Sequence, residues 1–267
     1  MTPAELLQPV LDIALEAGRR IMTVYGSADF GVTQKGDESP LTLADMAAHH
    51  HIVEALAKLP VSYPVLSEEA ADIPFETRRA WTHYWLVDPL DGTKEFIKRN
   101  GDFTVNIALV VDGYPVLGVV HAPALDLSYF AAEGAGAACI RAGTRQTIRT
   151  RVAPAVPAFV VSRSHKDAAL ETFLAAAPPH EAVSRGSSLK FCQVAEGSAD
   201  LYPRTGPTSE WDTAAGQCVA EQAGAQVLRL PGFARLRYNQ KESLLNPLFA
   251  VIGDPTKDWK TLLSTVG

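Results

Sequence analysis

The sequence predicts a two-lobed α/β protein, with an α+β lobe over residues 1–153 and an α/β lobe over residues 154–267. Three observations support this fold class. Apolar residues recur at helical spacing near the start of the chain, several strand patterns follow in close succession, and strand and helix patterns then alternate. The proline-rich stretch RVAPAVPAF marks the expected boundary between the lobes.

The first lobe is expected to begin with two helices, over residues 3–25 and 42–59, and Pro60 would end the second. A short apolar strand is expected at residues 84–87. The stretches FTVNIALVV, PVLGVVHA and LDLSYFAA follow it and are separated by the turns VDGYP and PALD. This spacing predicts an antiparallel meander.

The second lobe shows strand and helix patterns in turn, which favours an α/β arrangement. Strands are expected at residues 158–162 and 199–203, and helices at residues 166–176, 187–196 and 211–223.

Composition restricts the class of function. The 267 residues are 47% hydrophobic, which is enough for a substantial core, and the formal net charge is −6. An acidic balance without a basic stripe argues against a nucleic-acid-binding protein. The N-terminal stretch lacks the pattern of a signal peptide, and we expect no membrane span and a cytoplasmic protein. Cys139, Cys192 and Cys218 are expected to be buried free thiols.

Two aspartates stand at the end of the strand expected at residues 84–87, in the stretch WLVDPLDGTKEF. Pro89 removes a backbone donor, so the strand is expected to end there and the chain to turn. The turn would bring Asp88 and Asp91 together, and two ionised carboxylates repel each other unless a cation lies between them. Oxygen ligands suit Mg²⁺. A surface turn remains an alternative, because Asp-Gly is a common turn dipeptide.

Other carboxylates occupy similar positions. VLSEEA places Glu68 and Glu69 after an apolar run, and EWDTAAG places Asp212 at the start of a helix. Solvated surface groups or a helix cap would explain them too. Gly92 and Thr93 precede a short helix, whose free amides would bind a phosphate. Acidic ligands beside an anion pocket indicate metal-assisted phosphoryl transfer.

Taken together, these motifs resemble the inositol monophosphatase superfamily of Mg²⁺-dependent, lithium-sensitive phosphatases. Within it, LSEE, DPLDGTKEF, NGDFTVNIAL, SRSH and GSSLKF are most similar to bacterial 3′(2′),5′-bisphosphate nucleotidases. The resemblance extends from the first helix to about residue 251 and implies a layered αβαβα sandwich.

The resemblance also implies the metal site. Two or three Mg²⁺ ions per active site would be held by Glu68, Asp88, Asp91, Asp212 and the backbone carbonyl of Leu90. Residues 90–93 would hold the phosphate being cleaved. The implied catalytic residues are Asp45, which is linked in the family to a third metal and to water activation, Glu68, and Thr93, which would orient the attacking water. Lys35 matches a lysine near the same site.

For the substrate, the resemblance places His165 near the base or ribose, and Ser187, Lys190 and Arg204 on the 5′-phosphate. Cationic and hydroxyl donors suit such a phosphate. The further implied substrate contacts are Glu68, Leu90, Asp91, Gly92, Thr93 and Asp212. Surface positions for Lys190 and Arg204 remain alternatives. The three histidines at residues 49–51 are interpreted as a solvated helix surface.

The implied activity is hydrolysis of adenosine 3′,5′-bisphosphate (PAP) to AMP and phosphate by metal-activated water, in sulfur assimilation. It would extend to the sulfated nucleotide PAPS, which would be converted to APS. An inositol monophosphatase or a fructose-1,6-bisphosphatase would have the same metal centre, and a phosphate-ligand binding module is the non-enzyme alternative. A homodimer and peripheral association with the inner membrane are compatible with the resemblance.

Overall fold

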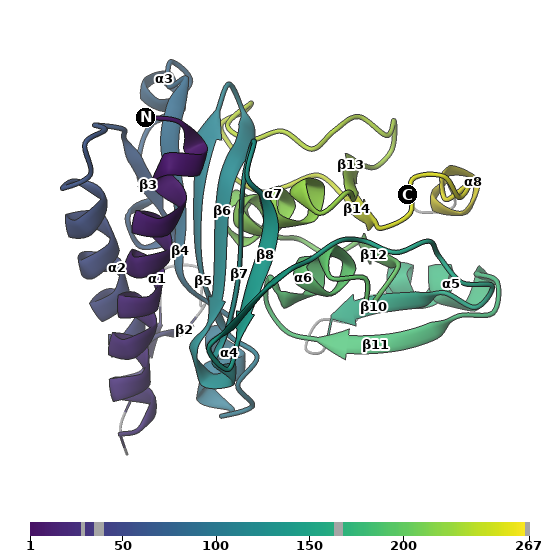
Figure 1. Cartoon of the computed structure of the whole chain (residues 1–267), viewed down its shortest axis with the longest axis horizontal. Coiled ribbons are helices and arrows are strands. Elements are labelled where there is room, and N and C mark those ends of the chain that lie inside the picture. The colour runs from purple at the N-terminus through teal and green to yellow at the C-terminus, as the bar shows by residue number, and fades with distance from the viewer. Residues whose placement is uncertain (28–29, 35–39, 163–167, 265–267) are drawn as a thin grey trace.

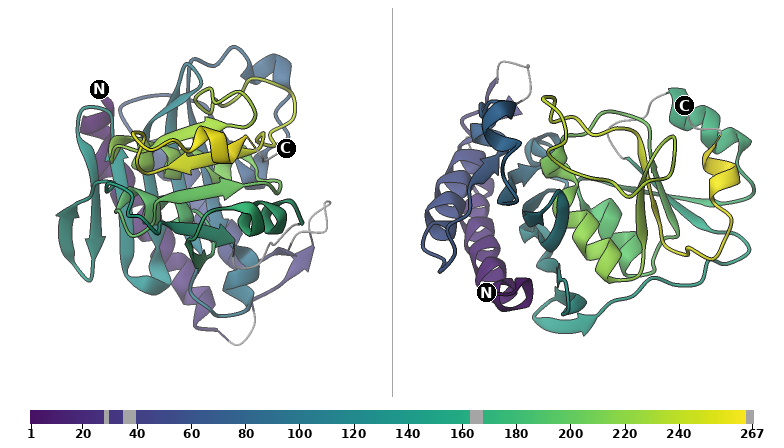
Figure 2. Two further views of the ribbon diagram at one scale, coloured as in Figure 1. Left: turned by 90° about the vertical axis from the view of Figure 1, so that its right-hand side faces the viewer. Right: turned by 90° about the horizontal axis from the view of Figure 1, so that it is seen from above.

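The computed structural model describes residues 1–27, 30–34, 40–162 and 168–264. Five layers follow one another across the molecule: two helices, a seven-stranded sheet, two helices, a five-stranded sheet and outer helices (Figure 1). Figure 2 shows the same layers from above, with α1 and α2 on one flank and the C-terminal elements on the other. The layered αβαβα fold expected from the sequence is confirmed.

The first layer consists of α1 (Pro3–Tyr25) and α2 (Leu43–Leu56). A threonine caps each helix, because the side chains of Thr2 and Thr42 accept from backbone amides in the first turn. The apolar face of α1 packs on the seven-stranded sheet and on α2. The first helix has the predicted bounds, whereas the second is shorter than the predicted 42–59.

The seven-stranded sheet contains one parallel pair, β3 with β4, followed by an antiparallel meander. Its strands, in spatial order, are β3 (Val65–Ser67), β4 (His83–Asp91), β5 (Thr104–Val111), β6 (Tyr114–Ala122), β7 (Leu127–Ala132), β8 (Gly136–Arg141) and β9 (Thr144–Thr147). The predicted meander is confirmed over β5, β6 and β7. The sequence did not indicate β8 and β9, whose residues lack a clear apolar alternation.

The strand predicted to stop at residue 87 continues as β4 to Asp91, so that prediction is wrong. The register with β5 shifts between Asp88 and Asp91, and Pro89 lies within this irregular stretch. Proline is tolerated there because no regular ladder bond is required from its nitrogen. The bulge places both aspartates at the end of a strand that is otherwise buried.

The five-stranded sheet has the spatial order β11-β10-β12-β14-β13. Its strands are β10 (Ala158–Ser162), β11 (Glu181–Arg185), β12 (Leu201–Arg204), β13 (Gln226–Arg229) and β14 (Phe249–Ile252). The predicted bounds of β10 are confirmed and those of β12 shift by one or two residues. The helix predicted at residues 211–223 divides into η3 (Glu210–Asp212) and α7 (Ala214–Gln222), with Thr213 between them.

The remaining elements are short or lie on the outside. They are β1 (Thr33–Gln34), β2 (Pro40–Leu41), η1 (Glu68–Ala70), α3 (Phe75–Arg78), α4 (Thr93–Ile97), η2 (Pro123–Leu125), α5 (Ala168–Ala176), α6 (Leu189–Ala195) and α8 (Lys260–Leu263). In the described part of the chain, no helix combines the length and the apolar character that a membrane crossing requires.

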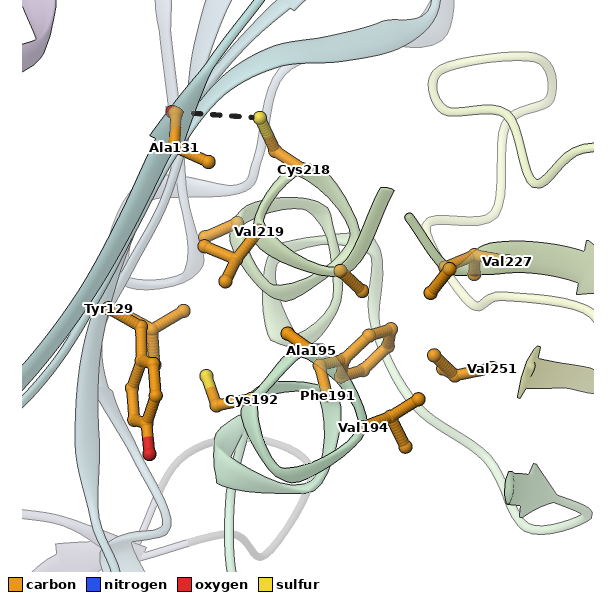
Figure 3. Close-up of a cluster of buried hydrophobic side chains, with 14 of the residues drawn as sticks. Tyr129, Ala131, Phe191, Cys192, Val194, Ala195, Cys218, Val219, Val227 and Val251 are labelled. Carbon is orange, nitrogen blue, oxygen red and sulfur yellow. Dashed lines mark hydrogen bonds between the residues drawn. The ribbon is translucent and has the colours of Figure 1, made fainter. Parts of the chain in front are cut away.

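Helices α6 and α7 form the middle layer, and their side chains fill the space between the two sheets (Figure 3). Cys192 and Val219 lie on the side of Tyr129, and Phe191 and Val194 lie on the side of Val227 and Val251. All three cysteines are buried and free, as predicted. This buried cluster contains residues of both predicted lobes, and the boundary between residues 153 and 154 stays a prediction.

Helix α7 lies directly against β6. A Cβ added at Gly118 would be 2.4 Å from the carbonyl oxygen of Ala215, so the glycine permits this close approach. Because Asp212 lies two residues before the start of α7, the packing of α7 on β6 also sets the position of that carboxylate relative to the end of β4.

His121, on β6, gives the fold a pH dependence. Its side chain is buried beside α1, and Nδ1 is 2.9 Å from the hydroxyl of Ser128. Burial lowers the pKa of His121 from 6.5 to about 4. The unfolded chain therefore binds a proton between these two values and the folded protein does not. The stability contribution is complete above pH 6.5 and is lost as the pH falls towards 4.

We expect the free energy of unfolding of the wild type to fall by roughly 2 kcal/mol more than that of His121→Gln between pH 7.5 and pH 5. Urea unfolding of both proteins at the two pH values measures this difference. All other titrating groups are common to both proteins and cancel in the comparison. Equal losses in the two proteins would show that His121 does not carry the effect.

Candidate metal and phosphate site

The end of β4 turns directly into α4. The amide of Leu90 donates to Oδ1 of Asp88 over 3.0 Å and holds that carboxylate against the bulge. Gly92 then adopts a φ of +93°, in the left-handed region that favours glycine. Thr93 begins α4, and its hydroxyl lies 3.5 Å from the carbonyl oxygen of Leu90. The turn therefore presents two carboxylates, a carbonyl and a hydroxyl within six residues.

Three carboxylates converge at this turn. Oxygen atoms of Asp88, Asp91 and Asp212 all lie within 4.8 Å of one another. Glu68, the residue that follows β3, is close enough to Asp88 for its negative charge to raise the pKa of Asp88. The four carboxylates predicted from the sequence are thus brought together by three separate segments of the chain.

The negative charges of the clustered carboxylates repel one another. Burial, followed by repulsion from Glu68, Asp91 and Asp212, raises the pKa of Asp88 well above its ordinary value. Burial, followed by repulsion from Asp91 and Glu68, raises the pKa of Asp212 to about 8. Carboxylate oxygens gathered at this spacing fit a hard divalent cation, which would remove the repulsion.

Asp212 reaches the cluster because η3 turns the chain sharply. The amide of Ser209 donates to Oδ2 of Asp212 over 2.9 Å. Both carboxylate oxygens of buried Glu210 accept from the amide of Asn239, at 2.9 and 3.0 Å. Nδ2 of Asn246 donates to the carbonyl of Ser209 over 2.8 Å. These contacts fix the turn from two sides.

Asp91 has partners that the sequence reasoning missed. The amide of Ser188 donates to Oδ2 of Asp91 over 2.7 Å, and Nδ2 of Asn106 lies 3.3 Å from the same oxygen. Asn106 also donates to the hydroxyl of Ser188 over 2.9 Å. A polar asparagine inside the apolar run FTVNIALVV was the available signal, because a buried amide needs a hydrogen-bonding partner.

The carboxylates line a cavity of about 580 Å³, whose walls also include Ser187, Lys190, Tyr202 and Arg204. Lys190 is 7% exposed and Arg204 is 8% exposed, so the surface alternative for both residues is wrong. The cavity wall thus contains both carboxylates and buried cationic side chains.

These two cations are held by backbone carbonyls. Nζ of Lys190 donates to the carbonyl of Ser187 over 2.6 Å, and a terminal nitrogen of Arg204 donates to the carbonyl of Pro207 over 2.7 Å. Burial lowers the pKa of Lys190 to about 8, against the opposing effect of Asp91. Nε of Arg204 is buried without a hydrogen-bond partner among the described residues. Such donors suit an anionic ligand.

Asp45 has a structural role in α2. Its Oδ2 accepts from the amide of Thr42 over 2.8 Å and from the Thr42 hydroxyl over 2.5 Å, which closes the capping box of the helix. Its assignment to water activation stays a prediction. Lys35 and His165 lie outside the described residues.

The interpretation of residues 49–51 as a solvated surface is wrong for two of the three histidines. Nδ1 of His49 is 2.9 Å from the hydroxyl of Ser67, next to Glu68. Nε2 of His51 is buried without a partner in the described part of the chain. His50 is exposed, whereas His49 and His51 are half-buried, because α2 packs on both η1 and α1.

The chain is similar to known proteins over most of its length. The 3′(2′),5′-bisphosphate nucleotidase CysQ of Salmonella typhimurium is 54% identical over 248 residues, which cover 92% of this chain and 99% of the relative. The crystal structure of CysQ from Bacteroides thetaiotaomicron superposes with a TM-score of 0.82 at 44% identity, over 92% of this chain and 96% of that chain.

The likeness of fold extends beyond these relatives. An inositol monophosphatase from Anabaena has a TM-score of 0.77 and covers 99% of this chain and 97% of its own, at 22% identity, which shows the fold alone. The model of the inositol monophosphatase family matches residues 3–262. The resemblance inferred from the motifs is therefore confirmed, and the chain belongs to the inositol monophosphatase family.

Proposed function

We propose that this protein is a Mg²⁺-dependent 3′(2′),5′-bisphosphate nucleotidase that hydrolyses adenosine 3′,5′-bisphosphate to AMP and phosphate. One observation carries the proposal: the carboxylate cluster and the buried cations Lys190 and Arg204 line the same cavity. A substrate with two phosphates needs both, because one phosphate reacts at the cation site and the other must be neutralised elsewhere. The identity of the relatives supports the nucleotide among phosphate esters.

We assign different roles to the residues of the cavity wall. Glu68, Asp88, Asp91, Asp212 and the carbonyl of Leu90 would hold the divalent cations. When bound, these cations supply positive charge that lowers the pKa of water and stabilises the departing oxygen. Thr93, whose hydroxyl lies near the Leu90 carbonyl, would orient the attacking water. Water adds to phosphorus, the bond from phosphorus to the 3′ oxygen breaks, and that oxygen receives a proton.

The second phosphate of the substrate would contact the cationic side chains of the cavity wall. Ser187, Lys190 and Arg204 would bind the 5′-phosphate, which fits the free Nε of Arg204 in the described structure. Gly92 faces Ser187, since a Cβ at Gly92 would be 2.9 Å from the Ser187 hydroxyl. The turn after β4 and the residues that precede α6 are thus in direct contact, and both line the cavity.

A phosphate-release assay with saturating Mg²⁺ tests the proposal on adenosine 3′,5′-bisphosphate, inositol 1-phosphate and fructose 1,6-bisphosphate. We expect kcat/KM for the nucleotide to exceed that for inositol 1-phosphate by about 100-fold or more, because inositol 1-phosphate has no second phosphate for the buried cations. We also expect it to exceed the value for fructose 1,6-bisphosphate, because the relatives are nucleotidases. A higher value for either sugar phosphate would assign the protein to another activity of the family. No release from any ester would favour the binding module.

We infer several further properties from the family resemblance. They are magnesium as the physiological ion with two or three ions per site, inhibition by lithium, action on PAPS, and a place in sulfur assimilation. A homodimer, a cytoplasmic location and peripheral membrane association belong to the same set of predictions.

A further inference from the structure

Asp102 connects the two sheets beside the proposed site. It belongs to the motif NGDFTVNIAL and lies in the loop between α4 and β5. Its carboxylate is buried and accepts from two successive residues at the end of β11. Oδ1 accepts from Arg185 over 3.0 Å, and Oδ2 accepts from the amide of Gly186 over 3.0 Å.

The backbone of Asp102 adds two contacts to the same junction. Its carbonyl accepts from the hydroxyl of Ser187. A Cβ added at Gly186 would be 2.7 Å from that carbonyl oxygen, so the two segments lie in direct backbone contact. Ser187 has a φ of +45°, which is unfavourable for a residue with a side chain. The contacts with Asp102 hold Ser187 in this conformation.

The residue after this junction reaches the proposed metal ligands. The Ser188 amide donates to Asp91, and the Ser188 hydroxyl lies 3.0 Å from Oδ2 of Asp91 and 2.5 Å from the carbonyl oxygen of Asp212. Ser188 therefore touches two segments that carry ligands. Its position depends on the direction in which the chain leaves Ser187.

We propose that Asp102 is a positioning residue for the metal site: it fixes the Arg185–Ser187 junction so that Ser188 orients Asp91. The inference rests on the proposed function, because it assigns to Asp91 the role of a metal ligand. Groups that orient a ligand commonly affect metal affinity although they do not touch the ion. The acidic residue in NGDFTVNIAL thereby has a role in the site.

The test uses Asp102→Asn in the full-length protein, with Asp200→Asn as the matched control. Asp200 is also buried, is paired with an arginine, Arg151, and accepts from a backbone amide, that of Ala158. Neither Asp200 nor Arg151 lines the cavity. Both substitutions remove one buried charge and weaken one ion pair, so they should lower the midpoint of thermal unfolding similarly.

Calorimetric titration with Mg²⁺ is the main measurement. We expect Asp102→Asn to weaken Mg²⁺ binding about tenfold or more, and Asp200→Asn to change it less than about twofold. The kcat for adenosine 3′,5′-bisphosphate at saturating Mg²⁺ should fall only in Asp102→Asn. Arg185→Gln removes one contact of Asp102 from a partly exposed position and should show the same direction if Asp102→Asn does not fold.

Wild-type Mg²⁺ affinity and kcat in Asp102→Asn, with a loss of thermal stability like that of Asp200→Asn, would overturn the positioning role. Wild-type protein that binds Mg²⁺ but hydrolyses no nucleotide bisphosphate would overturn the proposed function instead, and the comparison of Mg²⁺ affinities would still decide the role of Asp102.

Discussion

Asp91→Asn should reduce phosphate release from adenosine 3′,5′-bisphosphate by about a thousandfold or more while leaving the fold intact. Asparagine has nearly the same shape and its Oδ1 can accept from the Ser188 amide, as Asp91 does over 2.7 Å. It lacks the negative charge that a divalent cation requires. The loss of several kcal/mol of electrostatic stabilisation in the transition state corresponds to a rate loss of this size.

Thermal unfolding separates this effect from misfolding. In the presence of a chelator, the midpoint of Asp91→Asn should equal or exceed that of the wild type, because Asp88 and Asp212 no longer face a third charge. Added Mg²⁺ should raise the midpoint of the wild type and leave that of the variant unchanged. Near-normal turnover by the purified variant would contradict the assignment of Asp91 as a metal ligand.

Lys190→Met should lower kcat/KM for adenosine 3′,5′-bisphosphate by about 100-fold or more and lower it less than about tenfold for adenosine 3′-monophosphate. Lys190 is buried in the cavity wall, and methionine preserves its length without the charge. Burying a phosphate without a cationic partner costs several kcal/mol of binding free energy. Adenosine 3′-monophosphate has no 5′-phosphate and so does not incur this cost.

The assay is run on both substrates at saturating Mg²⁺. Lys98→Met, at the exposed end of α4, is the control for removal of a lysine and should behave as wild type. Equal losses on the two substrates would contradict a role for Lys190 at the 5′-phosphate. They would point to an effect on Asp91, the acidic group with the largest influence on the pKa of Lys190.

The carboxylates were predictable because each stands at the end of a recognisable element. Apolar runs precede Glu68 and Asp88, and a helical pattern follows Asp212. Local sequence therefore indicated which side chains leave the core at an element end, where functional groups gather. The motif resemblance then identified them as one site, which periodicity alone could not do because the segments are far apart in the chain.

The contacts that surround the proposed metal ligands were not predictable in this way. The contacts of Ser188 and Asp102 join segments separated by more than 80 residues, as in the bonds from Ser188 to Asp91 and from Gly186 to Asp102. For Asn106, the sequence indicated a buried polar group but not its partners Asp91 and Ser188. The exposure of Lys190 was equally undetermined, since lysine is usually solvated. The packing of α6 against both sheets buries it.

The amino-acid sequence by itself determined the α/β class through hydrophobic periodicity, and the layered fold and the family through motif resemblance, because both are properties of neighbouring residues. The same motifs indicated the four acidic side chains. Only the tertiary structure decided how far β4 extends, which donors hold Asp91, and that acidic and cationic groups share one cavity. Those features depend on which elements pack together, and the free energy of packing is distributed over contacts between distant parts of the chain.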